Sequence, residues 1–340
     1  MLRDIVQTLV ERRELSPAQM QDALEEILTG QAHEVEMAAF LTALRLRGET
    51  ASDIATAVQV LRRHAIPLPT SGRDVVDTCG TGGDGQCTFN VSTATAFVVA
   101  GCGLPVAKHG NRSVSSRCGS ADVLEALGVK IDVSPETSQR CLQEAGIAFC
   151  FAPRYHPAVR HVAAVRKRLG FRTLFNFLGP LVNPARAAFQ LIGVGDPALH
   201  PLLASACAAL GMKRAYVVHG EPGLDEVSLC GTTRVKVVEG ERVTEEVWHP
   251  EDFGLPCQSL EGQTVDNASE SAQLLHRILA GEASPAADLV VANAAAVLRL
   301  CGRAATLQEG VTQAREGINS GGASQALRVL VRCTTDTAGV

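Results

Sequence analysis

The sequence predicts an α/β protein in which a small all-helical domain is joined to a larger α/β domain with a central, mostly parallel sheet. Two observations lead to this prediction. Apolar residues recur at helical spacing through residues 1–72. From residue 73 onward, short apolar segments typical of strands alternate with helical segments and glycine-containing loops. We therefore expect domains at residues 1–72 and 73–340.

Four helices are expected in the first domain. The run that begins at Leu2 carries apolar residues three and four positions apart. Ser16 and Gln19 form a capping-box start with proline at the first helical position, and Gly30 provides a stop. The helices are predicted over residues 2–10, 16–30, 37–44 and 50–64, and a proline-containing linker follows.

The second domain alternates between strands and helices. Strands are predicted at residues 75–76, 105–107, 147–151, 191–194 and 215–218, with a hairpin at 234–247. Helices are predicted at residues 92–100, 121–127, 134–146 and 286–300. Such alternation is typical of a parallel sheet covered by helices. Residues 158–185 fit the alternation poorly, and we expect about 160–188 to return to the first domain.

Composition and charge exclude several classes of function. Hydrophobic residues make up 46% and charged residues 20%, which is typical of a globular rather than a disordered protein. The net charge of −5 lacks the basic balance of most nucleic-acid-binding domains. No segment reaches the about 18 apolar residues that a membrane helix needs, and the N-terminus lacks the apolar core of a signal peptide. We therefore expect a cytoplasmic protein with no nucleic-acid or membrane partner.

The cysteines do not form a recognisable framework. There are 11 of them, they are scattered, and no CxxC pair occurs. Disulfide scaffolds and structural zinc sites require an even number or a closer spacing. We expect most of the cysteines to be reduced thiols that pack as small apolar side chains.

The strongest local signal is a glycine-rich loop after the first predicted strand. Gly80, Gly82, Gly83 and Gly85 fall within six positions, which permits positive φ angles and close approach to a ligand. Backbone N–H groups of such a loop ahead of a helix attract phosphate. A dinucleotide-binding fold needs an acidic residue about 20 positions later, and a P-loop needs Gly-Lys-Ser/Thr, and neither is present. Taken alone, the loop is better explained as a tight structural turn.

Two polar segments follow the glycine-rich loop. Residues 88–93 open the next helix, where their side chains either cap that helix or face a diphosphate or metal ion. Residues 108–117 carry Lys, His, Asn, Arg and Ser side chains after a strand and suit an anion. A solvated basic loop is the alternative. Loops at the ends of neighbouring parallel strands converge on one crevice, which favours a phosphate site.

An acidic pair, Asp225 and Glu226, follows a later strand. Mg²⁺ is held by a few carboxylates together with water and substrate phosphates. An acidic surface turn is the alternative for the pair in isolation. In combination with the phosphate loops, the pair predicts a site for a magnesium diphosphate.

Taken together, these motifs resemble the anthranilate phosphoribosyltransferases over essentially the whole chain. The residues that carry the resemblance are 80–84, 90–93, 108–116, 119–128, 156–157, 165–170, 172–173, 175–176, 178–181, 183–185, 219–220 and 223–226. Two positions depart from the family pattern. Cys79 and Cys118 stand where members often carry Ile, Val or Ser, and the family reaction requires no thiol.

The resemblance implies the fold shared with pyrimidine nucleoside phosphorylases and a homodimer of two-domain subunits. It implies a Mg²⁺-dependent transfer of the phosphoribosyl group of 5-phosphoribosyl 1-pyrophosphate to the amine of anthranilate. The products are N-(5-phosphoribosyl)anthranilate and pyrophosphate, and the reaction belongs to L-tryptophan biosynthesis.

The resemblance also implies site residues. Mg²⁺ is expected on Ser92, Asp225 and Glu226, and anthranilate on Gly80, Asn111 and Arg166. Lys108 and Arg166 are expected to act through charge and positioning, and no general base is assigned. The residues expected to bind phosphoribosyl pyrophosphate are Gly80, Gly83, Asp84, Thr88, Asn90, Val91, Ser92, Thr93, Lys108, His109, Gly110, Asn111, Arg112, Ser113, Val114, Ser115, Ser116 and Ser120.

Two other functions compete with this expectation. A nucleoside phosphorylase of the same fold would use phosphate and a pyrimidine nucleoside, but the segment around Arg166 and the loop at Asn111 argue against it. A nucleic-acid-binding protein of similar fold would show a basic groove and degraded substrate loops. The negative net charge and the intact loops disfavour that alternative.

Overall fold

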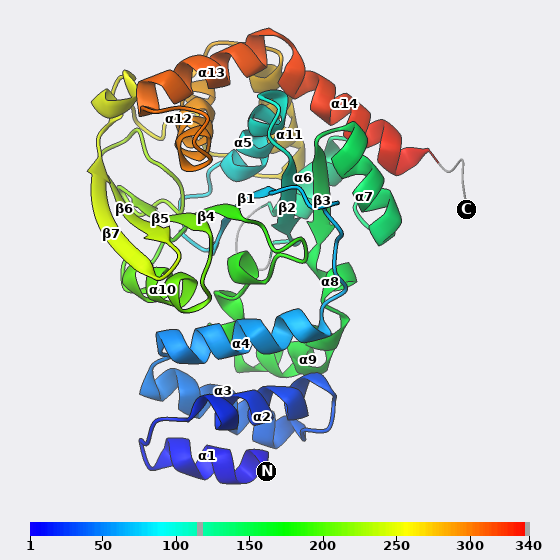
Figure 1. Ribbon diagram of the computed structural model, residues 1–340, viewed down its shortest axis with the longest axis vertical. Coiled ribbons are helices and arrows are strands. Elements are labelled where there is room, and N and C mark those ends of the chain that lie inside the picture. The colour runs from blue at the N-terminus through cyan, green and yellow to red at the C-terminus, as the bar shows by residue number, and fades with distance from the viewer. Residues whose placement is uncertain (114–117, 337–340) are drawn as a thin grey trace.

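A seven-stranded sheet with the order β3-β2-β1-β4-β5-β6-β7 forms the centre of the larger of two lobes (Figure 1). The structure is a computed structural model that describes residues 1–113 and 118–336. The strands are β1 (Val76–Gly80), β2 (Val106–Gly110), β3 (Ile147–Phe151), β4 (Phe189–Gly193), β5 (Arg214–Gly220), β6 (Thr233–Glu239) and β7 (Arg242–Trp248).

The first five strands run parallel, and β6 and β7 add an antiparallel hairpin at one edge. The predicted fold class, an α/β fold with a mostly parallel sheet and a helical domain, is therefore confirmed. The predicted hairpin corresponds to β6 and β7, whose connecting turn places Gly240 at a φ of 57°. Because β1 lies between β2 and β4, the loops after these strands open at the same edge of the sheet.

The smaller lobe is built from the N-terminal helices α1 (Leu2–Val10), α2 (Pro17–Leu28), α3 (Glu34–Arg47) and α4 (Ala51–His64). The capping box expected at the start of α2 is present, because the Ser16 side chain accepts from the Gln19 amide and the Gln19 side chain accepts from the Ser16 amide. A second capping box joins Thr50 and Asp53 at the start of α4. These local bonds satisfy N–H groups that a helix start otherwise leaves unpaired.

Helices cover both faces of the sheet. They are α5 (Val91–Gly101), α6 (Ser120–Ala126), α7 (Pro135–Glu144), α10 (Leu199–Ala209), α11 (Ala268–Leu279), α12 (Pro285–Leu300), α13 (Leu307–Asn319) and α14 (Gly322–Thr335). In Figure 1, α5 and α11–α14 lie above the sheet, and α10 lies below it. No helix in residues 1–113 and 118–336 is long and apolar enough to cross a membrane.

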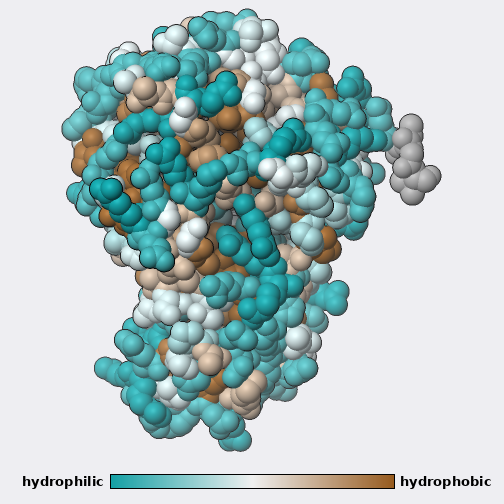
Figure 2. Space-filling model, in the orientation of Figure 1, coloured by the Kyte–Doolittle hydropathy of each residue, from teal (hydrophilic) through white to brown (hydrophobic). Residues whose placement is uncertain are grey.

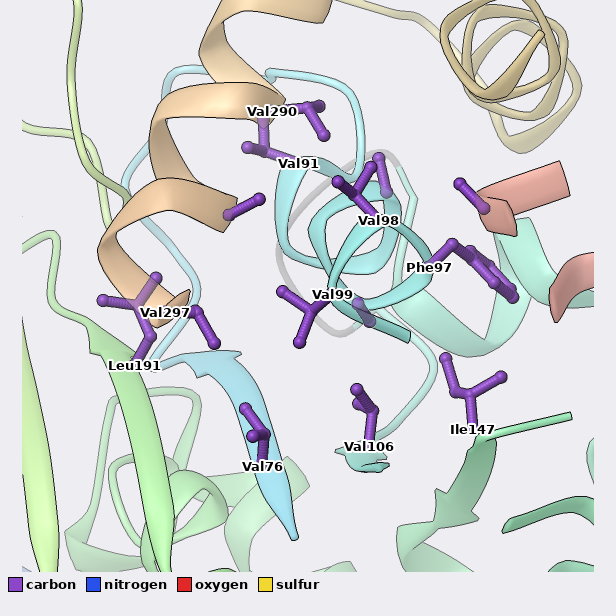
Figure 3. Packing of buried hydrophobic residues seen from close by; sticks show 14 of the residues in the cluster. Val76, Val91, Phe97, Val98, Val99, Val106, Ile147, Leu191, Val290 and Val297 are labelled. Atoms are coloured by element: carbon purple, nitrogen blue, oxygen red, sulfur yellow. The ribbon is translucent and has the colours of Figure 1, made fainter. Parts of the chain in front are cut away.

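The helix α5 is the centre of the larger core. Its side chains Phe97, Val98 and Val99 are fully buried, and the helix packs against α12, α14 and the strands β1–β3 (Figure 3). A Cβ atom at Gly101 would lie 2.5 Å from the backbone nitrogen of Ala323, so glycine allows α5 and α14 to touch. This packing fixes the N-terminus of α5 at the edge of the sheet where the loops open.

A segment after β3 crosses to the smaller lobe and returns. It contains α8 (Ala152–Tyr155), α9 (Arg160–Leu169) and the short 3₁₀ turns η1 (Pro157–Val159), η2 (Leu174–Asn176) and η3 (Gly179–Val182). We call residues 152–188 the returning segment. Its buried apolar side chains from Val162 to Val182 share one buried cluster with those of α1–α4. At the end of the segment, Arg62 of α4 donates to the carbonyl oxygen of Leu181 at 2.8 Å.

Candidate active site

A cavity of about 760 Å³ lies between the open ends of the strands and the returning segment. The two lobes meet there at a narrow waist (Figure 2). Most of the residues expected from the sequence line this cavity. They are Gly80, Gly83, Asp84, Thr88, Asn90, Val91, Ser92, Lys108, His109, Gly110, Asn111, Arg112, Ser113, Ser120, Arg166, Asp225 and Glu226. Val114, Ser115 and Ser116 lie outside the described residues.

The glycine-rich loop is held against the acidic pair. The Gly82 amide donates to Oδ2 of Asp225 at 2.8 Å, and a Cβ atom at Gly80 would lie 2.3 Å from the same oxygen. Gly82 and Gly83 have φ angles of 66° and 70°, in the left-handed region that favours glycine. Gly193 at the end of β4 is equally close, since a Cβ atom there would lie 1.5 Å from the carbonyl oxygen of Asp225. Glycine is therefore required where the two loops meet.

Three carboxyl groups gather at this point and repel one another. Withdrawal from water, together with the charge of Asp84, raises the pKa of Asp225 to about 7. Withdrawal from water, together with the charge of Asp225, raises the pKa of Glu226 well above its usual value, although the Lys108 charge opposes this shift. Such a cluster has excess negative charge when it is ionised.

The donor chemistry of the cluster fits a hard divalent cation. Among residues 1–113 and 118–336, no three His, Cys, Asp or Glu side chains stand ready as a complete metal cage. Mg²⁺ does not require one, because it takes one or two carboxylates and completes its shell with water and substrate phosphates. Asp225 and Glu226 are the carboxylates that would hold it, and the open cavity leaves room for a phosphate ligand.

Ser92 and Lys108 complete this side of the cavity. The Ser92 amide, in the first turn of α5, donates to Oε1 of Glu226 at 3.1 Å. Lys108 on β2 is buried, and its Nζ atom donates to the Ser92 hydroxyl at 3.2 Å and to the Thr78 carbonyl. The capping role considered for residues 88–93 is thus taken by Glu226, because the Asn90 side chain makes no capping bond to α5.

Arg166 faces the cavity from the opposite side, on α9. Its Nε atom is buried and has no hydrogen-bond partner, and its guanidinium lies over the Phe175 ring, with 5.4 Å between Cζ and the ring centroid. Burial lowers the pKa of Arg166 from its ordinary value. A guanidinium that is partly desolvated and has no carboxylate partner favours the binding of an anionic ligand.

Two histidines line the wall between Arg166 and the strand ends. His109 hydrogen-bonds through Nδ1 to the Gly179 carbonyl at 2.9 Å, and its ring meets that of His156 edge-on at 5.1 Å. Burial lowers the pKa of His109 to about 3 and that of His156 to about 4. Both imidazoles are therefore neutral at physiological pH and add no positive charge to the cavity.

The low pKa of His156 predicts a pH-dependent stability. The His156 imidazole takes up a proton near pH 6.5 in the unfolded chain but only near pH 4 in the folded protein. The free energy of unfolding therefore falls as the pH drops below 6.5. His156→Gln removes this contribution. When the pH is lowered from 7.5 to 5.5, the free energy of unfolding measured in urea should fall by about 1.4 kcal/mol more for the wild type than for the variant. An unchanged difference between the two proteins would show that His156 titrates alike in both states.

Three of the residues expected to bind phosphoribosyl pyrophosphate are either buried outside the cavity or already bonded to other side chains. Thr93 is fully buried in α5 and does not line the cavity. The Arg112 guanidinium is bound by Glu125 and Asp122 of α6 rather than left free for phosphate. Asn90 lines the cavity, but its side chain is held by Ser271 of α11, whose hydroxyl donates to Oδ1 at 2.8 Å.

Sequence reasoning assigned no site role to several residues of the cavity wall. The returning segment and Leu61 of α4 supply them. The family motifs over residues 156–181 contain most of these residues and are the sequence signal for them. Within these motifs, the resemblance implies a role only for Arg166. Besides Leu61, the wall residues include His156, Arg160, Arg172, Phe175, Asn176, Gly179 and Pro180.

Neither cysteine at the departing positions is reactive. Burial raises the pKa of the Cys118 thiol to about 11 and raises that of Cys79 still further. A nucleophilic cysteine requires a lowered pKa, so both thiols are neutral and inert. The Cys118 thiol instead donates to Oδ1 of Asn90 at 3.0 Å.

Comparison with known proteins assigns each lobe to a domain of the glycosyl transferase family. Residues 72–324 match the model of the glycosyl transferase family, a/b domain, and residues 3–65 match the glycosyl transferase family, helical bundle domain. The chain is 48% identical over 331 residues to anthranilate phosphoribosyltransferase of Moorella thermoacetica, covering 97% of this chain and 98% of the relative.

Solved structures agree in fold and sequence. The chain is similar to anthranilate phosphoribosyltransferase from Thermus thermophilus, with a TM-score of 0.91, 42% identity, and coverage of 97% of this chain and 99% of that one. It is also similar to the enzyme from Saccharomyces cerevisiae in complex with PRPP (phosphoribosyl pyrophosphate) and Mg, with a TM-score of 0.90, 31% identity, and coverage of 98% and 97%. The yeast enzyme has also been solved with 4-fluoroanthranilate.

Proposed function

The chain belongs to the anthranilate phosphoribosyltransferases, and from this membership we propose how its cavity performs the family reaction. The protein transfers the phosphoribosyl group of 5-phosphoribosyl 1-pyrophosphate to the amine of anthranilate. The reaction depends on Mg²⁺, releases pyrophosphate and serves tryptophan biosynthesis.

The observation that carries the assignment of roles is that two different anion receptors face one cavity. The glycine-rich loop and the acidic cluster lie at the strand ends, and the unpaired guanidinium of Arg166 lies across from them. A diphosphate with its metal suits the first receptor, and a planar carboxylate suits the second. The donor and the acceptor would then be held together between the two lobes, which removes the entropy cost of bringing them together in solution.

On the donor side, we assign Ser92, Asp225 and Glu226 to the metal. These residues would hold Mg²⁺ beside the diphosphate, where the ion would supply positive charge to the leaving pyrophosphate. Lys108 is fixed by two hydrogen bonds and adds a second positive charge beside the same group. The glycine-rich loop presents backbone N–H groups without side-chain obstruction. The remaining expected phosphate residues, including Thr88, Asn111, Ser113 and Ser120, surround this point.

On the acceptor side, Arg166 orients the carboxylate of anthranilate so that the amine approaches C1 of the ribose. The amine nitrogen forms the new bond to C1, and the bond from C1 to the pyrophosphate oxygen breaks with its electron pair on the leaving oxygen. Attack from the opposite face inverts C1 to the β configuration. An aromatic amine is unprotonated near neutral pH, so the site needs no strong general base.

A fluorescence assay tests the function directly. Purified protein is mixed with anthranilate, phosphoribosyl pyrophosphate and Mg²⁺, and anthranilate fluorescence is followed with and without EDTA. We expect a loss of fluorescence that EDTA abolishes. Folded protein that leaves the fluorescence unchanged would contradict the proposal, and turnover of uridine or thymidine with phosphate would replace it with a phosphorylase.

We propose that the protein is a homodimer that associates through the helical lobe, and that it acts in the cytoplasm, where its small-molecule substrates are available. The lobe comprises residues 1–72 together with about 160–188. On its surface, α1 and α3 expose the apolar side chains Val10, Val35 and Leu46 at 63%, 69% and 84%. These exposed aliphatic side chains are the observation that supports an interaction surface on this lobe.

Leu46→Glu tests this surface. We expect the mass measured by light scattering to fall from that of a dimer to that of a monomer, because the charge would be buried unpaired at the interface. Val247→Glu is the control, since Val247 is exposed on β7 of the other lobe. A monomeric wild type, or a dimer that Leu46→Glu leaves intact, would contradict the assignment.

A further inference from the structure

Arg172 belongs to a family motif but has no role in the reaction as described above. It lies between α9 and η2, and it lines the cavity. Its backbone is fixed on both sides. Gly170 ends α9 with a φ of 67°, and the fully buried Thr173 donates its amide to Oδ1 of Asn176 at 2.9 Å. The direction of the Arg172 side chain is therefore set by a rigid support.

The Arg172 side chain reaches from the returning segment to the glycine-rich loop. Its Nη2 atom donates to the carbonyl oxygen of Gly82 at 2.6 Å, across 90 positions of sequence. This hydrogen bond is charge-assisted, which makes it stronger than one between neutral groups. It joins the side of the cavity that holds Arg166 to the side that holds the phosphate loop.

Gly82 is bound from its other side as well. Its amide donates to Oδ2 of Asp225 at 2.8 Å. Asp225 and Arg172 therefore hydrogen-bond to the two peptide groups on either side of the Gly82 Cα atom. The loop has little rigidity of its own, because Gly82, Gly83 and Gly85 all adopt positive φ angles and carry no side chains that could pack. Apart from the hydrogen bond that the Thr81 amide donates to the Gly193 carbonyl at 2.8 Å, the conformation of the loop then depends on these two contacts of Gly82.

We propose that Arg172 is a positioning residue that holds the glycine-rich loop in its ligand-binding conformation and thereby couples the acceptor side of the cavity to the diphosphate and its metal. It acts through the Gly82 carbonyl and the orientation of the Gly82 amide toward Asp225. The naming of the diphosphate rests on the proposed function, whereas the effect of Arg172 on the loop does not.

The test compares Arg172→Met, which keeps much of the side-chain volume, with Arg172→Lys, which keeps the charge, and with the control Arg168→Ala. Arg168 lies on the surface of α9, pairs with Glu34 and does not line the cavity. In the ligand-free protein, hydrogen–deuterium exchange of peptides that cover residues 79–86 should be about fivefold to tenfold faster in Arg172→Met. Arg172→Lys should fall between this variant and the wild type, and Arg168→Ala should match the wild type.

Steady-state kinetics provide the second measurement. Arg172→Met should raise the KM for phosphoribosyl pyrophosphate about tenfold and shift the Mg²⁺ titration in the same direction, while the KM for anthranilate changes less than about twofold. Arg172→Gln, which retains a neutral donor, replaces Arg172→Met if the latter does not fold.

The possible results separate the alternatives. Unchanged exchange over residues 79–86 in every Arg172 variant would overturn the proposal. A raised KM for anthranilate with unchanged exchange would also overturn it, and would assign Arg172 to direct contact with the acceptor. Because exchange is measured without substrate, a wild type that lacks transferase activity would contradict the proposed function and leave this inference to be judged by the exchange data alone.

Discussion

Replacing both acidic residues with amides, as Asp225→Asn with Glu226→Gln, is expected to lower kcat/KM about a thousandfold at millimolar Mg²⁺. The amides keep the size of the carboxyl groups but remove the two negative charges that would hold the metal beside the pyrophosphate. Raising the Mg²⁺ concentration should recover part of the activity. The measurement is the rate of anthranilate consumption as a function of Mg²⁺ concentration.

The same double variant should be more stable than the wild type, which distinguishes a lost site from a damaged fold. Burial and mutual repulsion raise the pKa values of Asp225 and Glu226, so the ionised pair destabilises the metal-free protein. We expect Tm to rise by a few degrees while activity falls. Glu241→Gln with Glu261→Gln, both exposed, is the matched control. An unchanged Mg²⁺ titration would remove Asp225 and Glu226 from the metal site.

Arg166→Ala is expected to raise the KM for anthranilate about a hundredfold, which corresponds to ~2.7 kcal/mol. The guanidinium has no carboxylate partner of its own in the described ranges, so its charge is available to the substrate carboxylate in a partly desolvated site. The KM for phosphoribosyl pyrophosphate should change less than about threefold, because Arg166 lies across the cavity from the glycine-rich loop.

Two further variants sharpen the Arg166 experiment. Arg166→Lys keeps the charge but loses the planar fork, and we expect it to recover only part of the anthranilate binding. Arg168→Ala removes a surface arginine from the same helix and should leave both KM values unchanged. Equal losses for both substrates in Arg166→Ala would refute its placement at the acceptor.

The fold could be predicted in detail because most of its signals are local. The capping residues Ser16 and Thr50 each bond within three positions, and the strand segments carry their own apolar runs. The predicted strand at residues 147–151 coincides with β3 (Ile147–Phe151). Local signals depend on neighbouring residues alone, so a single sequence contains them.

The geometry of the site could not be predicted to the same depth, because it depends on contacts between distant residues. The bond from Gly82 to Asp225 spans 143 positions, and nothing in either loop specifies the other. Thr93 has the residue type of a phosphate ligand, but the packing of α5 turns it into the core. Arg112 has the right charge, but α6 supplies it with carboxylate partners. Residue type indicates the possible chemistry, and tertiary packing decides which groups are free to perform it.

The path of the chain through the two lobes has an evolutionary consequence. In the proposed assignment, loops at the strand ends bind the donor, whereas much of the opposite wall comes from the single segment between β3 and β4. These two parts of the gene encode largely separate walls, which are joined by the contact from Arg172 to Gly82. A lineage could therefore alter acceptor recognition mainly through residues 156–182, together with Gly80 and Asn111, while retaining most of the donor site. Because the returning segment is one continuous stretch of chain, most of the residues on the acceptor side lie together in the gene.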